Sequence, residues 1–405
     1  MLRYQSNSKG SKPAMKHGGW ASLILIYLYG VVSAASLTKA IPLQSQISAL
    51  PGGSLALFGL FISLMAVLPA IFGTVSGAVI DRLGARPALM FAALIGAGVN
   101  GLYAVTGSFL GFQGIRILEG CVPLLTYAAA PALMIAVSAP ERRSAAMALW
   151  SSYTPVGTSL GLLISAAFAT GPHWRFAYLT HGAVFVLLAA LALVLPRIAT
   201  AAPVAALPRR SIIGLLRTHE GAAPLRLASA FGILILLGLG VSVVMPPHLA
   251  HQYGISISAA SGLVALANVV MILGSALSGI ILTRGMRPAT LFLALALIGS
   301  VAGFGVFAPW TRLAFTLAAL LVWLVCTGAA MAVLASLLPR VAAPEHRAST
   351  AGLLSQTGAL MTFITSPLWL AVLALNQWLA LVLIILAGWV SGAMLLPAQA
   401  RAGAR

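Results

Sequence analysis

Long apolar stretches alternate with short polar ones along almost the whole chain. A helix needs about 20 mainly apolar residues to cross a bilayer, and stretches of this kind occur twelve times. The expected helices lie near residues 20–41, 54–80, 88–106, 110–137, 144–168 and 176–195, and then near 227–250, 259–283, 289–307, 313–338, 348–375 and 378–396. The pattern predicts an all-α, polytopic membrane protein with twelve transmembrane helices.

The twelve expected helices divide into two bundles of six. Residues 20–195 form the predicted N-terminal bundle and residues 227–396 the C-terminal bundle, and between them residues 196–226 are rich in Pro, Ala and Arg. This basic connection is too polar to cross lipid. Residues 1–19 and 397–405 are the predicted tails.

Composition excludes a water-soluble globule. Only 7% of the 405 residues are charged and 60% are hydrophobic, whereas a soluble domain has about 25% charged residues. The net charge of +18 would indicate nucleic acid binding in a soluble protein, but the basic residues form short clusters between apolar stretches. That arrangement is typical of a topology signal in a protein surrounded by lipid. Two cysteines inside apolar stretches exclude a disulfide framework.

The basic residues predict the orientation of the chain. Nineteen of the 23 Lys and Arg residues lie in the N-tail, the even-numbered connections and the C-tail, and cytoplasmic segments retain such residues during insertion. We therefore expect a multi-pass protein of the inner (cytoplasmic) membrane with both termini in the cytoplasm. A cleaved secretory signal is the alternative for the first helix, but cleavage would leave eleven spans and spoil this alternation.

Two short sequences recur at about half the length of the chain. Residues 139–144 read Ala-Pro-Glu-Arg-Arg-Ser and residues 343–348 read Ala-Pro-Glu-His-Arg-Ala, an offset of 204. Residues 76–82 and 278–284 both begin with Ser-Gly and end with Arg. An Arg-Pro pair comes a few residues after each, at residues 86–87 and 287–288. These repeats predict a duplicated six-helix unit whose halves enclose a site between them.

The connection between the second and third helices resembles the best-known loop signature of the major facilitator superfamily, Gly77-x-x-x-Asp81-Arg82-x-Gly84-x-Arg86. The fourth helix carries Arg116-x-x-Glu119-Gly120, which is similar to the family element Arg-x-x-Gln-Gly with Glu in place of Gln. The resemblance implies two pseudo-symmetric bundles that rock about a central site. The fifth helix lacks the Gly-Pro and Gly-Gly pattern of the drug:proton antiporter branches, which argues against export.

The loop signature predicts a gate on the cytoplasmic side. Gly77 would allow close helix approach, and Gly84 would permit a tight turn. Asp81 would face a helix N-terminus or pair with one of three arginines in one state of the transport cycle, namely Arg82, Arg86 or Arg142. The alternative is that these arginines only determine topology, since surface ion pairs contribute about 0–1 kcal/mol.

Three ionisable side chains fall inside predicted helices: Lys39, Arg116 and Glu119. A charge at mid-bilayer costs about 2.5–3.5 kcal/mol on insertion scales, so each needs a partner, a cavity or a function. Arg116 and Glu119 are three residues apart and share a helix face. We expect Arg116 and Lys39 to bind substrate and Glu119 to carry a coupling proton. The alternatives are an Arg116–Glu119 pair that only stabilises the bundle and a Lys39 that snorkels to the rim.

The second half has no matching charges, because the offset of 204 leads from Arg116 and Glu119 to Leu320 and Trp323. Aromatic residues are candidates for stacking on a flat substrate, and we select Tyr27, Tyr153 and Trp323. Packing in the core or against lipid is the alternative for each. His248-x-x-His251 has no third ligand in the sequence, so no metal site is predicted.

These features favour a secondary transporter of a small organic solute. No Gly-x-x-x-x-Gly-Lys-Ser/Thr segment for ATP is present, and no paired catalytic groups indicate an enzyme. The three charges inside predicted helices sum to +1, which favours uptake of an anionic or ring-containing nutrient, for example one like a vitamin such as riboflavin. Export of a drug or siderophore by proton antiport is the alternative. We expect a functional monomer that binds a small-molecule solute and protons and uses no cofactor.

Overall fold

The computed structural model describes residues 19–139, 142–196, 222–341 and 347–401, and these are helical apart from short connections. Nearly all of the predicted N-tail and the larger part of the predicted linker lie outside these ranges. The described helices line up into twelve rods. The prediction of an all-α fold with twelve helices in two bundles is confirmed.

Six rods form the first half. Their bounds are α1 Trp20–Thr38, α3 Leu55–Ser63 continued by α4 Val67–Leu83, α5 Ala85–Val105, α6 Phe109–Glu119 continued by α7 Cys121–Val137, α8 Arg143–Ser151 continued by α9 Tyr153–Ala166, and α10 Phe176–Leu191. Short helical pieces join or end them: η1 Ile41–Leu43, α2 Gln44–Ser48, η2 Leu64–Ala66 and η4 Ala192–Val194.

Six further rods form the second half. They are α12 Ala222–Tyr253, α13 Ile257–Val269 continued by α14 Met271–Thr283, α15 Pro288–Phe307, α16 Leu313–Val341, α17 Arg347–Ala374 and α18 Trp378–Met394, with η7 Ala398–Arg401 at the end. Ten stretches in the described chain are long and apolar enough to cross a membrane, and α18 is a shorter apolar helix. The rod of α8 and α9 is divided at Ser152 into helices of 9 and 14 residues, each too short to span alone.

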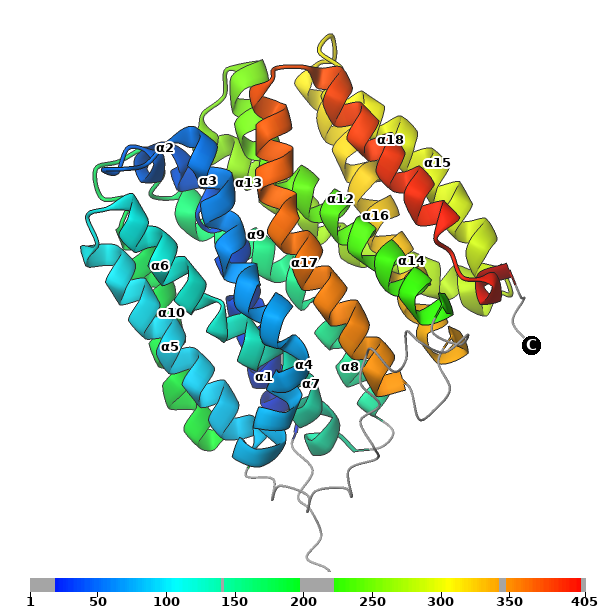
Figure 1. Ribbon diagram of the computed structural model, residues 1–405, viewed down its shortest axis with the longest axis horizontal. Helices are drawn as coiled ribbons and strands as arrows, with labels where there is room; N and C mark the ends of the chain where they lie inside the picture. Colours follow the sequence, from blue (N-terminus) through cyan, green and yellow to red (C-terminus); the bar gives the residue numbers. More distant parts are fainter. Residues whose placement is uncertain (1–18, 140–141, 197–221, 342–346, 402–405) are drawn as a thin grey trace, which may run out of the picture.

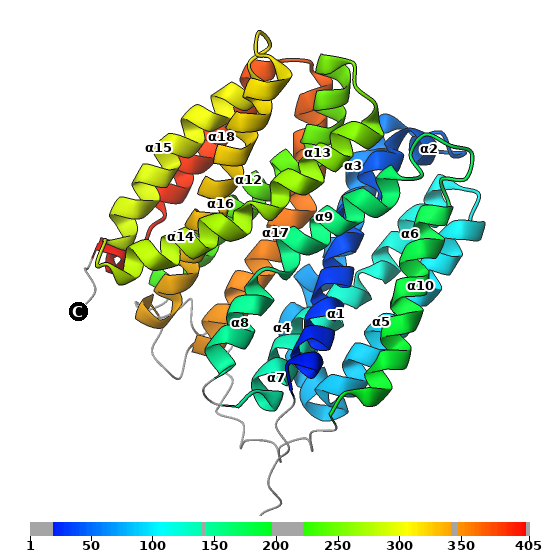
Figure 2. The same ribbon diagram turned by 180° about the vertical axis from the view of Figure 1, so that it is seen from behind.

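The two halves lie side by side, with α17 next to α3 and α4 on one face and α9 next to α13 on the other (Figures 1 and 2). We call the end where α1 begins and η7 lies the termini end, and the other the far end. At the far end the halves touch directly: Ser258 Oγ donates to the carbonyl oxygen of Ala166 at 2.8 Å. Gly59 of α3 packs against the backbone of Pro367 in α17. The halves are therefore joined at the far end.

The turns between the second and third rods of each half have the same backbone conformation. Gly84 has φ 86° and Gly285 has φ 92°, and the two are 201 residues apart, the same offset as the repeated Arg-Pro pairs. Side chains with a Cβ rarely adopt this region, so glycine allows the turn. The role predicted for Gly84 in a tight turn agrees with this geometry, and the duplication extends to single backbone angles.

We expect Gly84→Ala to lower the free energy of unfolding by about 1–2 kcal/mol, because Ala is strained at a positive φ. Gly285→Ala should have a similar effect. Thermal unfolding of the purified protein in detergent measures both. Gly98→Ala is the control, since no atom lies within 4 Å of an added Cβ there. A loss of stability in Gly98→Ala equal to that in Gly84→Ala would contradict the explanation.

Helix α9 packs directly on the backbone of α1 through two glycines. A Cβ added at Gly157 would meet the carbonyl oxygen of Val31, and one added at Gly161 would meet that of Ala35. Thr38 Oγ1 also donates to the carbonyl oxygen of Thr158 at 2.7 Å. Because small residues allow two backbones to approach closely, the end of α1 is held firmly to α9.

Candidate transport site

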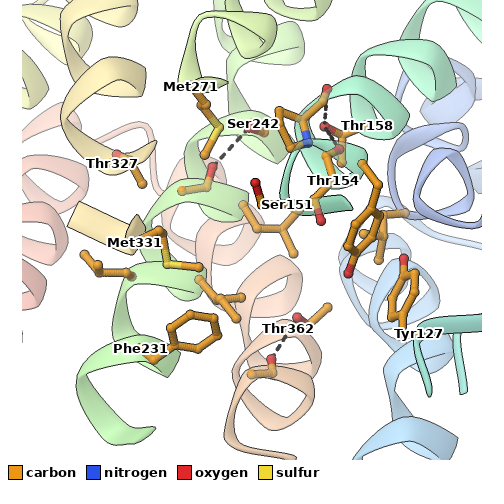
Figure 3. A pocket seen from close by; sticks show the side chains of 18 of the residues that line it. Tyr127, Ser151, Thr154, Thr158, Phe231, Ser242, Met271, Thr327, Met331 and Thr362 are labelled. Carbon is orange, nitrogen blue, oxygen red and sulfur yellow. Dashed lines mark hydrogen bonds between the residues drawn. The ribbon is translucent and has the colours of Figure 1, made fainter. Parts of the chain in front are cut away.

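A cavity of about 510 Å³ lies between the two halves, within the range of about 300–1,000 Å³ typical of small-molecule sites. Side chains from both halves point into it (Figure 3). The residues labelled there are Tyr127, Ser151, Thr154, Thr158, Phe231, Ser242, Met271, Thr327, Met331 and Thr362. The cavity therefore occupies the position in which paired halves hold a substrate.

The cavity is exposed toward the termini end. Ser151, Thr154 and Ser355 are exposed members of its wall, and Ser151 and Ser355 lie within nine residues of the starts of α8 and α17 at that end. At the far end, by contrast, Ser165 of α9 and Ser261 of α13 are fully buried. The exposed residues of the wall thus lie toward the termini end, whereas these far-end residues of α9 and α13 are buried.

The wall of the cavity is apolar with scattered hydroxyl groups. Among the described residues that line it, none is charged. Several hydroxyls donate to carbonyl oxygens of their own helix: Ser242 to Gly238 at 3.0 Å, Thr327 to Trp323 at 2.9 Å, and Thr362 to Gly358 at 2.9 Å. A hydroxyl has one hydrogen and two lone pairs, so these groups offer acceptor lone pairs to a solute.

Of the aromatic residues selected from the sequence, Tyr153 lines the cavity. Its ring packs at a tilt on Trp150 and on Tyr127, with 4.4 Å and 4.9 Å between centroids. Tyr27 is outside the wall, but its hydroxyl lies 3.0 Å from Oγ of Ser152, which does line the cavity. Tyr27 thus orients a residue of the wall.

Trp323 lies elsewhere. It is fully buried in the second half, where its ring packs on Trp389 at 5.8 Å, and it is not part of the cavity wall. Gly303 lies against the same ring. The alternative considered from the sequence, core packing, describes its position in the structure.

Lys39, Arg116 and Glu119 meet inside the first half. Nζ of Lys39 lies 2.6 Å from Oε1 of Glu119, and Nη1 of Arg116 lies 2.8 Å from Oε2. The exposed fraction is 1% for Lys39 and 0% for the other two, so Lys39 does not snorkel to the rim. We call these three residues the charged cluster, and its formal charges sum to +1.

Polar side chains from two further helices complete the charged cluster. Lys39 Nζ donates to Oδ1 of Asn100 on α5 at 2.6 Å and lies 3.2 Å from Nδ1 of His181 on α10. The hydroxyl of Tyr103 donates to Glu119 Oε2 at 3.1 Å. Nε2 of His181 lies 3.0 Å from the carbonyl oxygen of Val32. Each charge is therefore paired and hydrogen-bonded, which buried charges require.

Arg116 also binds the backbone of neighbouring helices. Nη1 donates to the carbonyl oxygen of Ser36 at 2.8 Å, and Nη2 donates to that of Ile62 at 3.2 Å. Leu37 and Met65 both belong to the cavity wall. Ser36 directly precedes Leu37, and Ile62 lies three residues before Met65. The charged cluster is thus next to the cavity without lining it, and the roles predicted for Arg116 and Lys39 in substrate binding and for Glu119 in proton coupling stay predictions. The paired arrangement satisfies the charges inside the first half.

The predicted gate residues are only partly described. The surroundings of Gly77 and the side chain of Asp81 lie outside the described part of the structure, while Arg82 and Arg142 are exposed. Arg86 donates through Nε to the carbonyl oxygen of Ala192 at 2.9 Å and through Nη2 to that of Leu193 at 2.7 Å. In this state Arg86 binds the end of the sixth rod, because carbonyls at a helix end lack partners in their own helix.

Sequence reasoning missed most of the cavity wall. Ser242, Thr327, Thr362, Met271 and Met331 are single residues in apolar helices. The hydroxyl of a serine or threonine can donate a hydrogen bond to a carbonyl oxygen in the preceding turn of its own helix. The presence of these residues in a helix therefore does not indicate a binding site. Asn100 and His181 were visible as polar residues in apolar stretches, but nothing in the sequence related them to Lys39.

Solved structures with the same architecture include a bacterial homologue of the human lysosomal transporter Spinster, inward-facing and unoccupied, with a TM-score of 0.70, 18% identity, and coverage of 93% of this chain and 94% of that one. The inward-open xylose transporter XylE from E. coli has a TM-score of 0.74, 14% identity, and coverage of 93% and 95%. The human organic anion transporter MFSD10 has a TM-score of 0.70, 17% identity, and coverage of 93% and 99%. At these identities the likeness concerns the fold.

A search of curated proteins found no match. The family model described as Major Facilitator Superfamily matches residues 21–366, a range that extends from α1 into α17 and includes every residue of the cavity wall. The chain is a multi-pass membrane transporter and not an enzyme. It belongs to the major facilitator superfamily.

Proposed function

We propose that this transporter carries an uncharged, partly apolar organic solute with hydrogen-bond donor groups. The observation that carries the proposal is the wall of the central cavity, which has hydroxyl acceptors and thioether and aromatic surface but no charged residue among those described. An anion would lose its hydration there without gaining a cation, which is costly. N–H and O–H donors of a neutral solute would meet acceptor lone pairs such as those of Ser242, Thr327 and Thr362.

A flat, ring-bearing nutrient fits this wall better than an organic anion. Tyr153, Tyr127 and Phe231 supply aromatic surface, and Met271 and Met331 are adaptable apolar contacts. A neutral heterocycle of vitamin size, of which riboflavin is one example, has both a ring system and donor groups. Because the positive charge lies outside the wall, the electrostatic reason for preferring uptake over export no longer holds, and the sign of the driving gradient decides the direction.

We place the termini end in the cytoplasm because the basic residues concentrate in the connections on that side. The state described here would then be open to the cytoplasm. Rocking of the halves would close that end. The proposed gate consists of Gly77, Asp81 and Arg82 in the second half of α4 and Arg142, the residue before α8. Energy would come from protons bound in the charged cluster, which contacts the end of α1.

A thermal-stability screen of the purified protein tests the class of solute. Neutral heterocycles with donor groups should raise the melting temperature, since a ligand at 100 times its Kd adds about 2.7 kcal/mol to stability, whereas organic anions of equal size should not. Thr362→Trp should abolish the shift, because Thr362 is a residue of the wall and the indole would project into the cavity. Leu360→Trp is the control on the same helix, since Leu360 is exposed and outside the wall.

Transport is then measured in proteoliposomes with pH gradients of either sign. Accumulation of the stabilising solute, driven by one sign of gradient and lost in Thr362→Trp, is the expected result. Binding by anions alone, or stabilisation that persists unchanged in Thr362→Trp, would overturn the proposed solute class. Equal accumulation without any gradient would overturn the coupling to protons.

A further inference from the structure

The arrangement of charges decides which group of the charged cluster can release a proton most easily. Glu119 accepts hydrogen bonds on both oxygens, from Lys39 at 2.6 Å and from Arg116 at 2.8 Å. Protonation of Glu119 would leave two buried cations side by side with no counter-charge. Loss of a proton from Lys39 would instead leave a neutral Arg116–Glu119 pair, and an arginine does not deprotonate in proteins.

The hydrogen bonds around Lys39 differ between its ammonium and its neutral amine. Nε2 of His181 faces the carbonyl oxygen of Val32, which can only accept, so this nitrogen carries the hydrogen and Nδ1 presents a lone pair. That lone pair faces Nζ of Lys39 at 3.2 Å. An ammonium satisfies Glu119, Asn100 and His181 at once with its three hydrogens. A neutral amine has only two hydrogens, and its own lone pair would face another acceptor.

The titratable and polar groups that contact Lys39 Nζ, and the cation paired with them, come from three helices. On α5 these are Asn100 and Tyr103, on α6 Arg116 and Glu119, and on α10 Tyr178 and His181. The aromatic rings of Tyr103 and Tyr178 lie 5.3 and 5.1 Å from Nζ. Both rings favour the cation, so Glu119 and the two rings hold the proton while Arg116 repels it.

Tilted aromatic rings extend from the charged cluster to the connection before α10. The ring of Tyr103 packs on Phe112 at 4.9 Å and on Tyr178 at 4.6 Å between centroids, and Phe112 contacts Trp174 in that connection at 6.0 Å. Tyr103, Phe112 and Tyr178 are buried in the state described here. Movement of α1 relative to α5 and α10 would change the side from which water reaches Nζ.

The end of α1 connects Lys39 to the solute cavity and to the contact between the halves. Lys39 directly follows Thr38, whose hydroxyl bonds to the carbonyl oxygen of Thr158 in α9, and Thr158 lines the cavity. At the far end of α9, Ala166 accepts the hydrogen bond from Ser258 of the second half. A change at Lys39 can therefore be transmitted through packed elements to both places.

We infer that Lys39, with His181 as its neutral hydrogen-bond acceptor, is the proton-binding group of this transporter, at a site separate from the solute cavity. In the step, an N–H bond of Nζ breaks, its electron pair stays on nitrogen, and the proton passes to water on the side to which the first half is open. The charge of the cluster falls from +1 to zero. The inference rests on the proposed proton coupling and assigns the carrier to Lys39 in place of Glu119.

The first test measures the separation of the halves without any solute. Spin labels are attached at Thr170→Cys and Ala259→Cys, two exposed positions beside the contact at the far end, after Cys121 and Cys326 have been replaced with Ala. Pulsed electron paramagnetic resonance of the protein in lipid nanodiscs then gives the distance distribution from about pH 6 to about pH 11, a range that includes the usual lysine pKa of about 10.4. The distribution should change with pH.

Two substitutions distinguish the carriers. Lys39→Arg keeps the charge but cannot release a proton, and Lys39→Met imitates the neutral amine. Both should lose the pH response, and they should favour opposite distances. If Glu119 carried the proton, Lys39→Arg would retain the response, and that result would overturn the inference.

A second measurement observes Lys39 directly and does not depend on how the two Lys39 variants fold. The sequence has only four lysines, so replacing Lys9, Lys12 and Lys16 with Arg leaves Lys39 alone. With lysine labelled by ¹³C at Cε, its resonance should move from the ammonium to the amine position over the pH range in which the label distance changes. A resonance that stays at the ammonium position while the distance changes would refute the inference. Neither measurement uses a solute, so an error in the proposed solute class leaves both intact.

Discussion

Substitution of Glu119 with Gln is expected to lower the free energy of unfolding by about 3–5 kcal/mol, the usual effect of removing one partner from a buried ion pair. The loss is large because the positive charges of both partners remain buried. Lys39 and Arg116 are both within 2.8 Å of the Glu119 carboxylate, and without it two cations would share a buried site. Unfolding followed by tryptophan fluorescence in detergent, at a pH near neutrality, measures the loss.

Removal of a cation from the same cluster should cost less. Lys39→Met leaves Arg116 and Glu119 as a neutral pair, and Arg116→Met leaves Lys39 and Glu119 as another. The order of stability should therefore place Glu119→Gln below both methionine variants. The electrostatic account fails if Glu119→Gln is the mildest of the three, because the cluster would then be held together mainly by packing.

Gly161→Ala is expected to destabilise the protein by about 3 kcal/mol, at the upper end of the range for overpacking. An added Cβ at Gly161 would collide with the backbone carbonyl of Ala35 and lie 2.6 Å from Oγ1 of Thr38. A backbone cannot move aside as a flexible side chain can, so α1 and α9 would have to separate. The hydrogen bond from Thr38 to Thr158 would be lost with them. The change is measured as a fall in melting temperature and in the yield of monodisperse protein.

Gly262→Ala in α13 is the matched control, because no atom lies within 4 Å of an added Cβ there. Since Ala favours a helix over Gly by about 0.5–1 kcal/mol, this variant should be as stable as the parent or slightly more stable. Equal destabilisation in both variants would mean that the close approach of α1 and α9 is not the cause.

The sequence by itself determined the helices and their pairing into halves. The length and spacing of the apolar stretches predicted twelve helices because a chain in lipid must satisfy its backbone within each segment. The repeated Arg-Pro and Pro-Glu sequences predicted the duplication, and Gly84 and Gly285 at matching turns share a positive φ. Both kinds of information are local, since they depend on residues close together in the chain.

Only the tertiary structure decided which polar side chains meet. Lys39 lies 61 residues from Asn100 and 142 residues from His181 in the chain, and helix periodicity does not tell which neighbouring helix a face will contact. The sequence located three charges within the membrane, but packing paired them in the first half and left a cavity wall of hydroxyl and apolar groups. The physical reason is that an unpaired charge in lipid is so costly that partners from distant segments gather around it, and only the packed fold specifies which segments those are.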